Sequence, residues 1–333
     1  MERYRSNKDV VRSTLYKMTK KRLPIFLCIT LLFFTIAMTG CSNTKETDTK
    51  LLTELPLEIE FSYYGGFWNA SLFAEHSLFT SQEAFERIVT EEIIGICNLL
   101  GYQDFWTHVN PDAEKLELYF EFSSVSRSQT NWLSRFGEKG VTTSIFLLNK
   151  QYAGYNDGAL AHELTHVLAG PSFSRSLEDG LCEYVAEYVG YSSKIDFMKQ
   201  NNIDLSVQEF IKLNHELTSQ KLLEHNIATQ EQLDTIWDNV GASGGYTVGS
   251  GATWQTSIWY SLSESFTTYL IEQYGMEKVT SLIRNGIDES SYQEYLGKSF
   301  AEVKSEWKDY YDKLELSYTL EEYEQLLKEQ REL

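Results

Sequence analysis

Five consecutive residues have the types and the spacing of a catalytic metal site. They are His162-Glu163-Leu164-Thr165-His166. On a helix, side chains four residues apart project from one face, so both imidazoles can reach a single metal ion at about 2.0–2.1 Å. Glu163 lies one step round the helix, next to the open position of the metal. There its carboxylate can take a proton from a water molecule and pass it to a leaving amine. The motif predicts one zinc ion per chain, because zinc suits a four-coordinate, histidine-rich site with an open position.

The residues around this motif predict a helix of the right phase. Asn156-Asp157-Gly158 can cap its start, and Gly170-Pro171 ends it. An apolar face is formed by residues at i, i+4, i+7 and i+8, namely Leu160, Leu164, Val167 and Leu168. This leaves the two histidines and the glutamate of the motif turned away from the core. The alternative, a coincidental pattern on an amphipathic surface helix, is disfavoured by this phase and by the stop signal.

A zinc site with an open position needs a third protein ligand. The next predicted helix, which begins near Ser176 and runs to about Tyr191, offers four acidic residues: Glu178, Asp179, Glu183 and Glu187. The last three are four residues apart and share a face. Structural explanations compete, because Ser176 to Asp179 fits a capping box and the later two glutamates could form a solvated face. Periodicity alone leaves the choice of ligand open.

The elements that would position these residues begin with strands and continue with helices. The alternation of apolar residues predicts strands over Leu57–Tyr64, Glu114–Phe122 and Val141–Leu148, and a helix over Ser81–Leu100. Residues 192–240 are expected to be mostly helical, Gly241–Gly251 to be a flexible loop, and the chain from Trp254 onwards to be helical with breaks at Gly275 and near Gly297. Strands first and helices after them predict an α+β fold.

Composition excludes one large class of partner. The chain has 333 residues, of which 42% are hydrophobic and 14% aromatic, enough for a sizeable core. It carries 29 Lys+Arg against 48 Asp+Glu, a formal net charge of −19. A nucleic-acid-binding protein needs a basic stripe that displaces counterions from phosphates. No such stripe is present in the sequence, so nucleic acid is not expected as a partner.

The N-terminus has the pattern of an export signal. Lys20-Lys21-Arg22 precede an apolar run, Leu23–Met38, which is too short for a membrane span of about 20 residues and suits a signal peptide. Met38-Thr39-Gly40-Cys41 resembles the bacterial lipobox, in which the cysteine is lipidated and becomes the new N-terminus. The prediction is a chain tethered through Cys41 to the extracytoplasmic side of the cell membrane. An uncleaved membrane anchor is the alternative, and it places the rest of the chain on the same side.

Two cysteines remain in the exported part. Cys97 and Cys182 each lie in an apolar helical context, and two buried thiols are expected rather than a disulfide. The other histidines, His76, His108, His215 and His225, have no partner at a metal-ligand spacing and are expected to be ordinary surface or core residues.

Several segments together resemble the gluzincin metallopeptidases, especially the compact peptidase MA-like group. The two histidines are followed by Leu177-Glu178-Asp179-Gly180-Leu181-Cys182-Glu183-Tyr184, which is similar to an acid-Gly-Leu/Phe-Ala-Glu-Tyr run in that group. Further segments that match are Tyr260–Phe266, Tyr269–Gly275, Leu296–Phe300 and Glu306–Tyr310. The resemblance covers about residues 141–313 and does not extend to residues 51–135.

The resemblance implies a function and a set of roles. Asp179 takes the place of the glutamate that is the third zinc ligand in that group, and its side chain is one methylene shorter. Glu178 and Glu183 stay open as alternatives. Tyr260 corresponds to a residue that steadies the oxyanion formed when water attacks a peptide carbonyl, although a tyrosine beside Trp259 can also be simple packing. The implied protein is a zinc peptidase with a thermolysin-like minimal architecture that acts on peptide or protein substrates.

These inferences divide the chain into five parts. They are a lipoprotein signal peptide (1–40), a polar tether (41–54), an N-terminal α+β region (55–140), a peptidase MA-like catalytic domain (141–313) and a C-terminal helix (314–333). Two other functions fit the same residues. One is a surface binding lipoprotein that keeps the peptidase fold without turnover, and the other is hydrolysis of a non-protein amide such as one in cell-wall peptide.

Overall fold

The computed structural model describes residues 51–55, 58–64, 81–101, 115–122, 129–132, 141–147, 157–190, 194–244 and 254–331. All of them belong to one compact unit, Leu51–Leu333. The predicted signal peptide, Cys41, His76 and His108 lie outside the described residues. Among the helices that the structure describes, none combines the length and the apolar character needed to cross a membrane.

A small mixed sheet is built from β1 (Glu58–Tyr64), β2 (Lys115–Phe122), β3 (Gln129–Trp132) and β4 (Val141–Leu147). The strand order is β1-β2-β4-β3, in which β2 pairs with β1 and β4 in parallel and β3 pairs with β4 antiparallel. Alternate residues of β2 are buried, as the period of a strand requires: Leu116, Leu118 and Phe120. The predicted boundary at residues 140 and 141 falls within this sheet.

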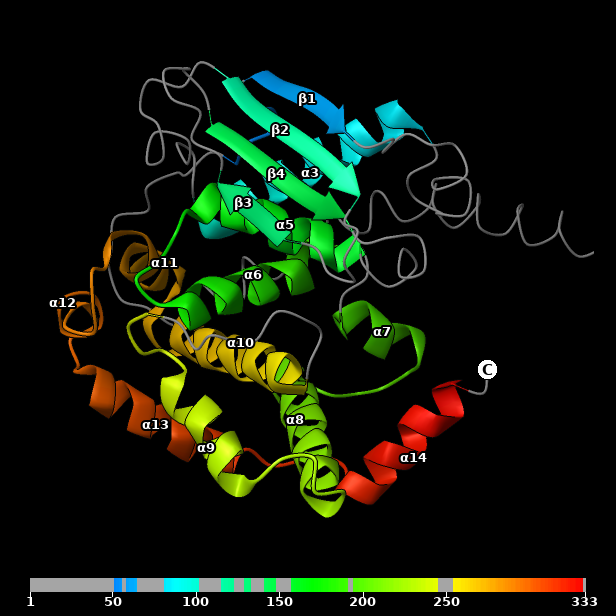
Figure 1. Cartoon of the computed structure of the whole chain (residues 1–333), viewed down its shortest axis with the longest axis vertical. Coiled ribbons are helices and arrows are strands. Elements are labelled where there is room, and N and C mark those ends of the chain that lie inside the picture. Colours follow the sequence, from blue (N-terminus) through cyan, green and yellow to red (C-terminus); the bar gives the residue numbers. More distant parts are fainter. Residues whose placement is uncertain are drawn as a thin grey trace, which may run out of the picture. The chain divides into compact units, whose positions relative to one another are not determined.

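Helix α3 (Gln82–Leu100) packs its apolar side against the sheet. Ser81 caps its start by accepting a hydrogen bond from the amide of Ala84, and Gly101 ends it in the left-handed conformation at φ 71°. The ring of Phe85 meets that of Phe120 on β2 edge to face, with centroids 4.8 Å apart. Figure 1 shows α3 beside the sheet, and the two share one apolar core.

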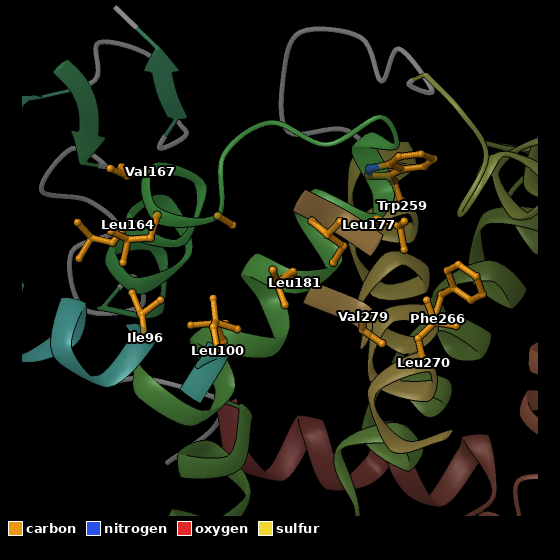
Figure 2. Close-up of a cluster of buried hydrophobic side chains, with 14 of the residues drawn as sticks. Ile96, Leu100, Leu164, Val167, Leu177, Leu181, Trp259, Phe266, Leu270 and Val279 are labelled. Atoms are coloured by element: carbon orange, nitrogen blue, oxygen red, sulfur yellow. The ribbon is translucent and has the colours of Figure 1, made fainter. Parts of the chain in front are cut away.

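Three helices form the centre of the structure, and they are the ones that carry the candidate site. Helix α5 (Asp157–Ala169) packs on α6 (Arg175–Val189), which packs in turn on α10 (Trp254–Tyr274). Figure 2 shows apolar residues of all three helices, among them Leu164 of α5, Leu181 of α6 and Leu270 of α10. Gly170 ends α5 at φ 77°, a conformation that glycine adopts without strain.

The remaining helices surround this centre. They are α7 (Lys194–Gln200), α8 (Val207–Glu224), α9 (Gln230–Asn239), α11 (Met276–Asn285), α12 (Ser291–Leu296), α13 (Phe300–Lys313) and α14 (Leu320–Arg331). Capping boxes begin α8, α9 and α13. The buried Lys212 of α8 donates to the carbonyl oxygens of Tyr311, at 2.6 Å, and of Leu314, at 3.3 Å, at the end of α13. Lys212 therefore links α8 to the end of α13, two helices that are far apart in the sequence.

The described residues are mostly helical and include a small sheet, which is compatible with the predicted α+β class, and most of the predicted elements within them are present. The breaks at Gly275 and Gly297 occur as expected, whereas strand β3 and the break at Gly286 were not predicted. The capping box at Ser176 is wrong. Helix α6 begins one residue earlier with Ser174 as its N-cap, and the Ser176 hydroxyl accepts a 2.6 Å hydrogen bond from the amide of Gly241.

Candidate metal centre

The packing of α5 on α6 brings together three side chains that can hold a metal ion. His162 and His166 project from α5 and Cys182 from α6, and their ligand atoms all lie within 4.8 Å of one another. All three residues are buried. Imidazole nitrogens and a thiolate sulfur are ligands that suit zinc and several other transition metals.

Each imidazole is oriented by a carboxylate on α6. His162 Nδ1 lies 3.0 Å from Glu183 Oε1, and His166 Nδ1 lies 2.8 Å from Glu178 Oε1. A carboxylate that accepts a hydrogen bond from Nδ1–H fixes the tautomer in which Nε2 carries the free lone pair. With Nδ1 held by these carboxylates, each ring would bind a metal ion through Nε2, once the ion has displaced the additional proton of His166.

Asp179 lies beside His166, and its two carboxylate oxygens have different surroundings. Its Oδ2 accepts hydrogen bonds from Arg175 Nε at 3.1 Å and from Trp259 Nε1 at 3.4 Å. Its Oδ1 is buried without a hydrogen-bond partner and lies 3.4 Å from His166 Nε2. Two ligands at about 2.0–2.1 Å from a tetrahedral ion lie about 3.4 Å apart, so the two atoms are spaced as ligands of one metal. The Nε2–H group of protonated His166, or a metal ion bound by both residues, can be the partner of this oxygen.

Asp179 is nevertheless not one of the three residues whose ligand atoms lie within 4.8 Å of one another. Its role as the third ligand therefore stays a prediction. The two alternatives weighed for that role, Glu178 and Glu183, instead make the contacts to the Nδ1 atoms of the two histidines. The sequence had placed Cys182 only as a buried thiol.

The close approach of α6 to α10 depends on Gly180. A Cβ atom at this position would lie 2.2 Å from the carbonyl oxygen of Ser263 and 2.3 Å from the hydroxyl of Thr267, both on α10. Any other residue would therefore push the two helices apart. Gly180 therefore lets the backbone of α6 approach α10 directly after Asp179, whose carboxylate lies beside His166.

Glu163 and Tyr260 are the two predicted catalytic residues. Glu163 is 4% exposed, and it follows His162 directly on α5. Tyr260 on α10 places its ring 5.7 Å from the ring of His162, edge to face. Burial, together with the negative charges of Asp179 and Glu183, raises the pKa of the Tyr260 phenol, so that this group stays protonated and able to donate a hydrogen bond.

The charged side chains around the two histidines stabilise one another. Burial alone would lower the pKa of His166, but Cys182, Asp179 and Glu178 raise it well above the usual value. Burial alone would raise the pKa of Asp179, but its contact with His166 lowers it. Burial raises the pKa of the Cys182 thiol to about 12. A metal ion that took these ligands would have to displace protons from both His166 and Cys182.

Two expectations about burial have different outcomes. Cys97 and Cys182 are both free and buried, as predicted. The expectation that the polar residues of the motif turn away from the core is only half right. They lie opposite the apolar face of α5, yet His162 is 7% exposed and His166 is 3% exposed, because α6 covers this side of the helix as well.

His215 and His225 lie outside the site, as expected. His215 is buried in α8 and its Nδ1 lies 2.8 Å from the hydroxyl of Tyr311, whereas His225 is exposed at the end of α8. Comparisons of the chain with protein-family models, with curated proteins and with solved structures find no match. The resemblance to the gluzincins therefore rests on the residues quoted for it.

Proposed function

We propose that this chain is a zinc-dependent peptidase of gluzincin type and thermolysin-like architecture, tethered through lipidated Cys41 to the extracytoplasmic side of the cell membrane. One observation carries the proposal. Two histidines four residues apart are each held at Nδ1 by a carboxylate, while Oδ1 of Asp179, which accepts no hydrogen bond, lies 3.4 Å from His166 Nε2. Structural scaffolds need no general base, so Glu163 between the two histidines favours hydrolysis.

The chemistry follows from the residues in their places. A bound zinc ion would supply Lewis acidity, polarising a carbonyl group and making water more acidic. Glu163 would accept the proton of the water that attacks the peptide carbonyl. The carbon–nitrogen bond then breaks as Glu163 returns that proton to the departing amine, so the carboxylate ends the cycle ionised. Tyr260 would donate its hydroxyl hydrogen bond to the oxyanion, a role that its raised pKa permits at neutral pH.

The first test measures metal and turnover together. The full-length chain, purified without added metal, is expected to contain about one zinc per chain and to cleave members of a library of linear peptides. A chelator should remove both the zinc and the cleavage, and added zinc should restore them. Zinc without cleavage of any linear peptide would refute the peptidase assignment and keep the metal centre. No zinc, even after zinc is offered, would refute both.

A second candidate function is supported by Cys182. If its thiolate and Asp179 both bound the ion beside the two histidines, four protein ligands would close the coordination shell. Closed four-ligand zinc sites are structural, whereas catalytic sites keep one position open. The chain would then be a lipid-anchored binding protein whose metal holds α5 against α6.

Cobalt substitution distinguishes the open site from the closed one. Thiolate bound to Co²⁺ gives an intense near-ultraviolet charge-transfer band, which histidine and carboxylate ligands do not give. For the peptidase we expect Co²⁺ to bind without this band, and Cys182→Ala to keep its metal and its cleavage. The band, together with its loss in Cys182→Ala, would establish the thiolate ligand and favour the binding protein. Cys97→Ala is the matched control, since that thiol is equally buried and lies outside the group.

A further inference from the structure

A second cluster of charged residues adjoins the metal centre. Lys194, the first residue of α7, directs its ammonium group at three carboxylates, and we call these four residues the Lys194 cluster. Lys194 Nζ lies 3.3 Å from Glu183 Oε2, 2.9 Å from Glu187 Oε1 and 2.9 Å from Glu264 Oε2. Glu183 and Glu187 come from α6, and Glu264 comes from α10. Three helices thus meet at a single ammonium group.

Two of the three carboxylates in the cluster are buried, and its other two members are partly exposed. The side chains of Glu187 and Glu264 are 4% and 1% exposed, and those of Glu183 and Lys194 are 25% and 28% exposed. The Ile195 amide also donates a 3.1 Å hydrogen bond to Glu187 Oε2, so the start of α7 is fixed to α6 twice. Burial would lower the pKa of Lys194, but Glu264, Glu183 and Glu187 raise it well above the usual value, so the cation stays charged.

Glu183 is shared between this cluster and the metal centre. One of its oxygens, Oε2, is 3.3 Å from Lys194 Nζ, and the other, Oε1, is 3.0 Å from His162 Nδ1. A carboxylate held at both oxygens has one orientation, which in turn sets the orientation of the imidazole. His166 has a counterpart on the other side, because Arg175 Nη1 donates a 2.9 Å hydrogen bond to the Glu178 oxygen that contacts it.

We propose that Lys194 is a positioning residue of the metal centre, which acts through Glu183 to hold His162 Nε2 toward the ion. This inference rests on the metal centre of the proposed function and adds a residue from α7, outside the two helices of the ligands. The orientation of His162 then depends on where α7 lies. Lys194 and Ile195 fasten that helix to α6, so α7 is part of the site's support.

The test measures zinc affinity and stability separately in the full-length chain. Lys194→Met is expected to weaken zinc binding about tenfold, the lower end of what removing an outer-shell partner costs, measured by chelator competition at one pH. Lys212→Met is the matched control. It also removes an ammonium group with several polar contacts, but one that contacts the end of α13 instead of the site. It should lower the thermal midpoint while leaving zinc affinity unchanged.

A double-mutant cycle identifies the route through Glu183. Glu183→Gln alone should weaken zinc binding about tenfold or more. Adding Lys194→Met to it should change the zinc affinity little further, because both substitutions act through the contact between Glu183 and His162. Lys194→Arg, which keeps the charge and its reach to Glu183, should recover most of the affinity. Independent, additive losses would overturn the proposed route.

A further variant keeps the proposal testable if Lys194→Met does not fold. In Lys194→Met/Glu264→Leu a buried ion pair is replaced by apolar side chains, a change that is often neutral for stability. Glu183 is still deprived of its cation, so the loss of zinc affinity should persist. Wild-type zinc affinity in this variant or in folded Lys194→Met would overturn the proposal, as would a wild-type chain that binds no zinc. A chain that binds zinc without cleaving peptides would refute only the peptidase function and leave this proposal to the affinity data.

Discussion

Glu163→Gln is expected to reduce peptide cleavage by about 10³-fold while leaving about one zinc bound per chain. General acid–base catalysis by a positioned side chain contributes typically 10²–10⁴-fold, and glutamine has the same shape but cannot accept the proton of the attacking water. The ligand atoms of the two histidines are unaffected, so the metal should stay. The measurement is kcat/KM on a peptide that the wild-type chain cleaves, beside zinc content by elemental analysis.

The control for this variant is Glu92→Gln on α3. Glu92 is also buried, at 1% exposure, but it lies on a helix that contributes no residue to the site. Its substitution should change stability without changing turnover per zinc-loaded molecule. Equal losses of activity in the two variants would mean that removing any buried carboxylate lowers activity, and that the effect at Glu163 is not evidence for a general base. Full activity of Glu163→Gln would remove Glu163 from the mechanism.

The sequence is sufficient to predict the part of the site that lies on one helix. The spacing of His162 and His166 fixes their common face because a helix repeats every 3.6 residues, whatever packs around it. The same local signals place Ser81 and Gly101 at the ends of α3 and Gly170 at the end of α5, because caps and stops depend on neighbouring residues. Interactions between residues close in the sequence determine the shared helix face and the helix ends, so both can be predicted from sequence patterns.

The contacts between helices could not be predicted in this way. Periodicity does not choose among Glu178, Asp179 and Glu183. Only the packing of α6 on α5 places Glu178 and Glu183 at the Nδ1 atoms and Asp179 beside Nε2. Cys182 three residues after Asp179 was a usable signal, since residues three apart share a face. Lys194 carried no signal, because its partners come from α6 and α10 and its role depends on where α7 lies.

His166→Ala is expected to remove nearly all zinc and to destabilise the metal-free protein as well. The variant loses one ligand, and it leaves Glu178 and Asp179 without the imidazole that each contacts. Breaking a buried ion pair by removing one partner costs about 3–5 kcal/mol. His215→Ala is the control for loss of a buried imidazole. Burial lowers the pKa of His215 to about 4, so it is neutral, and its removal should leave zinc content unchanged.

The destabilisation by His166→Ala should depend on pH with a definite sign. The pKa of His166 in the folded, metal-free protein is raised well above its unfolded value of about 6.5. The stability that protonated His166 contributes is therefore fully present below about pH 6.5 and is lost as the pH rises through the folded pKa. Unfolding free energies of the two metal-free proteins should differ more at pH 6 than at pH 9. Zinc affinity should change in the opposite direction, rising with pH, because the ion must displace this proton. A difference in stability that did not shrink toward pH 9 would mean that packing, and not charge, holds His166 between the two carboxylates.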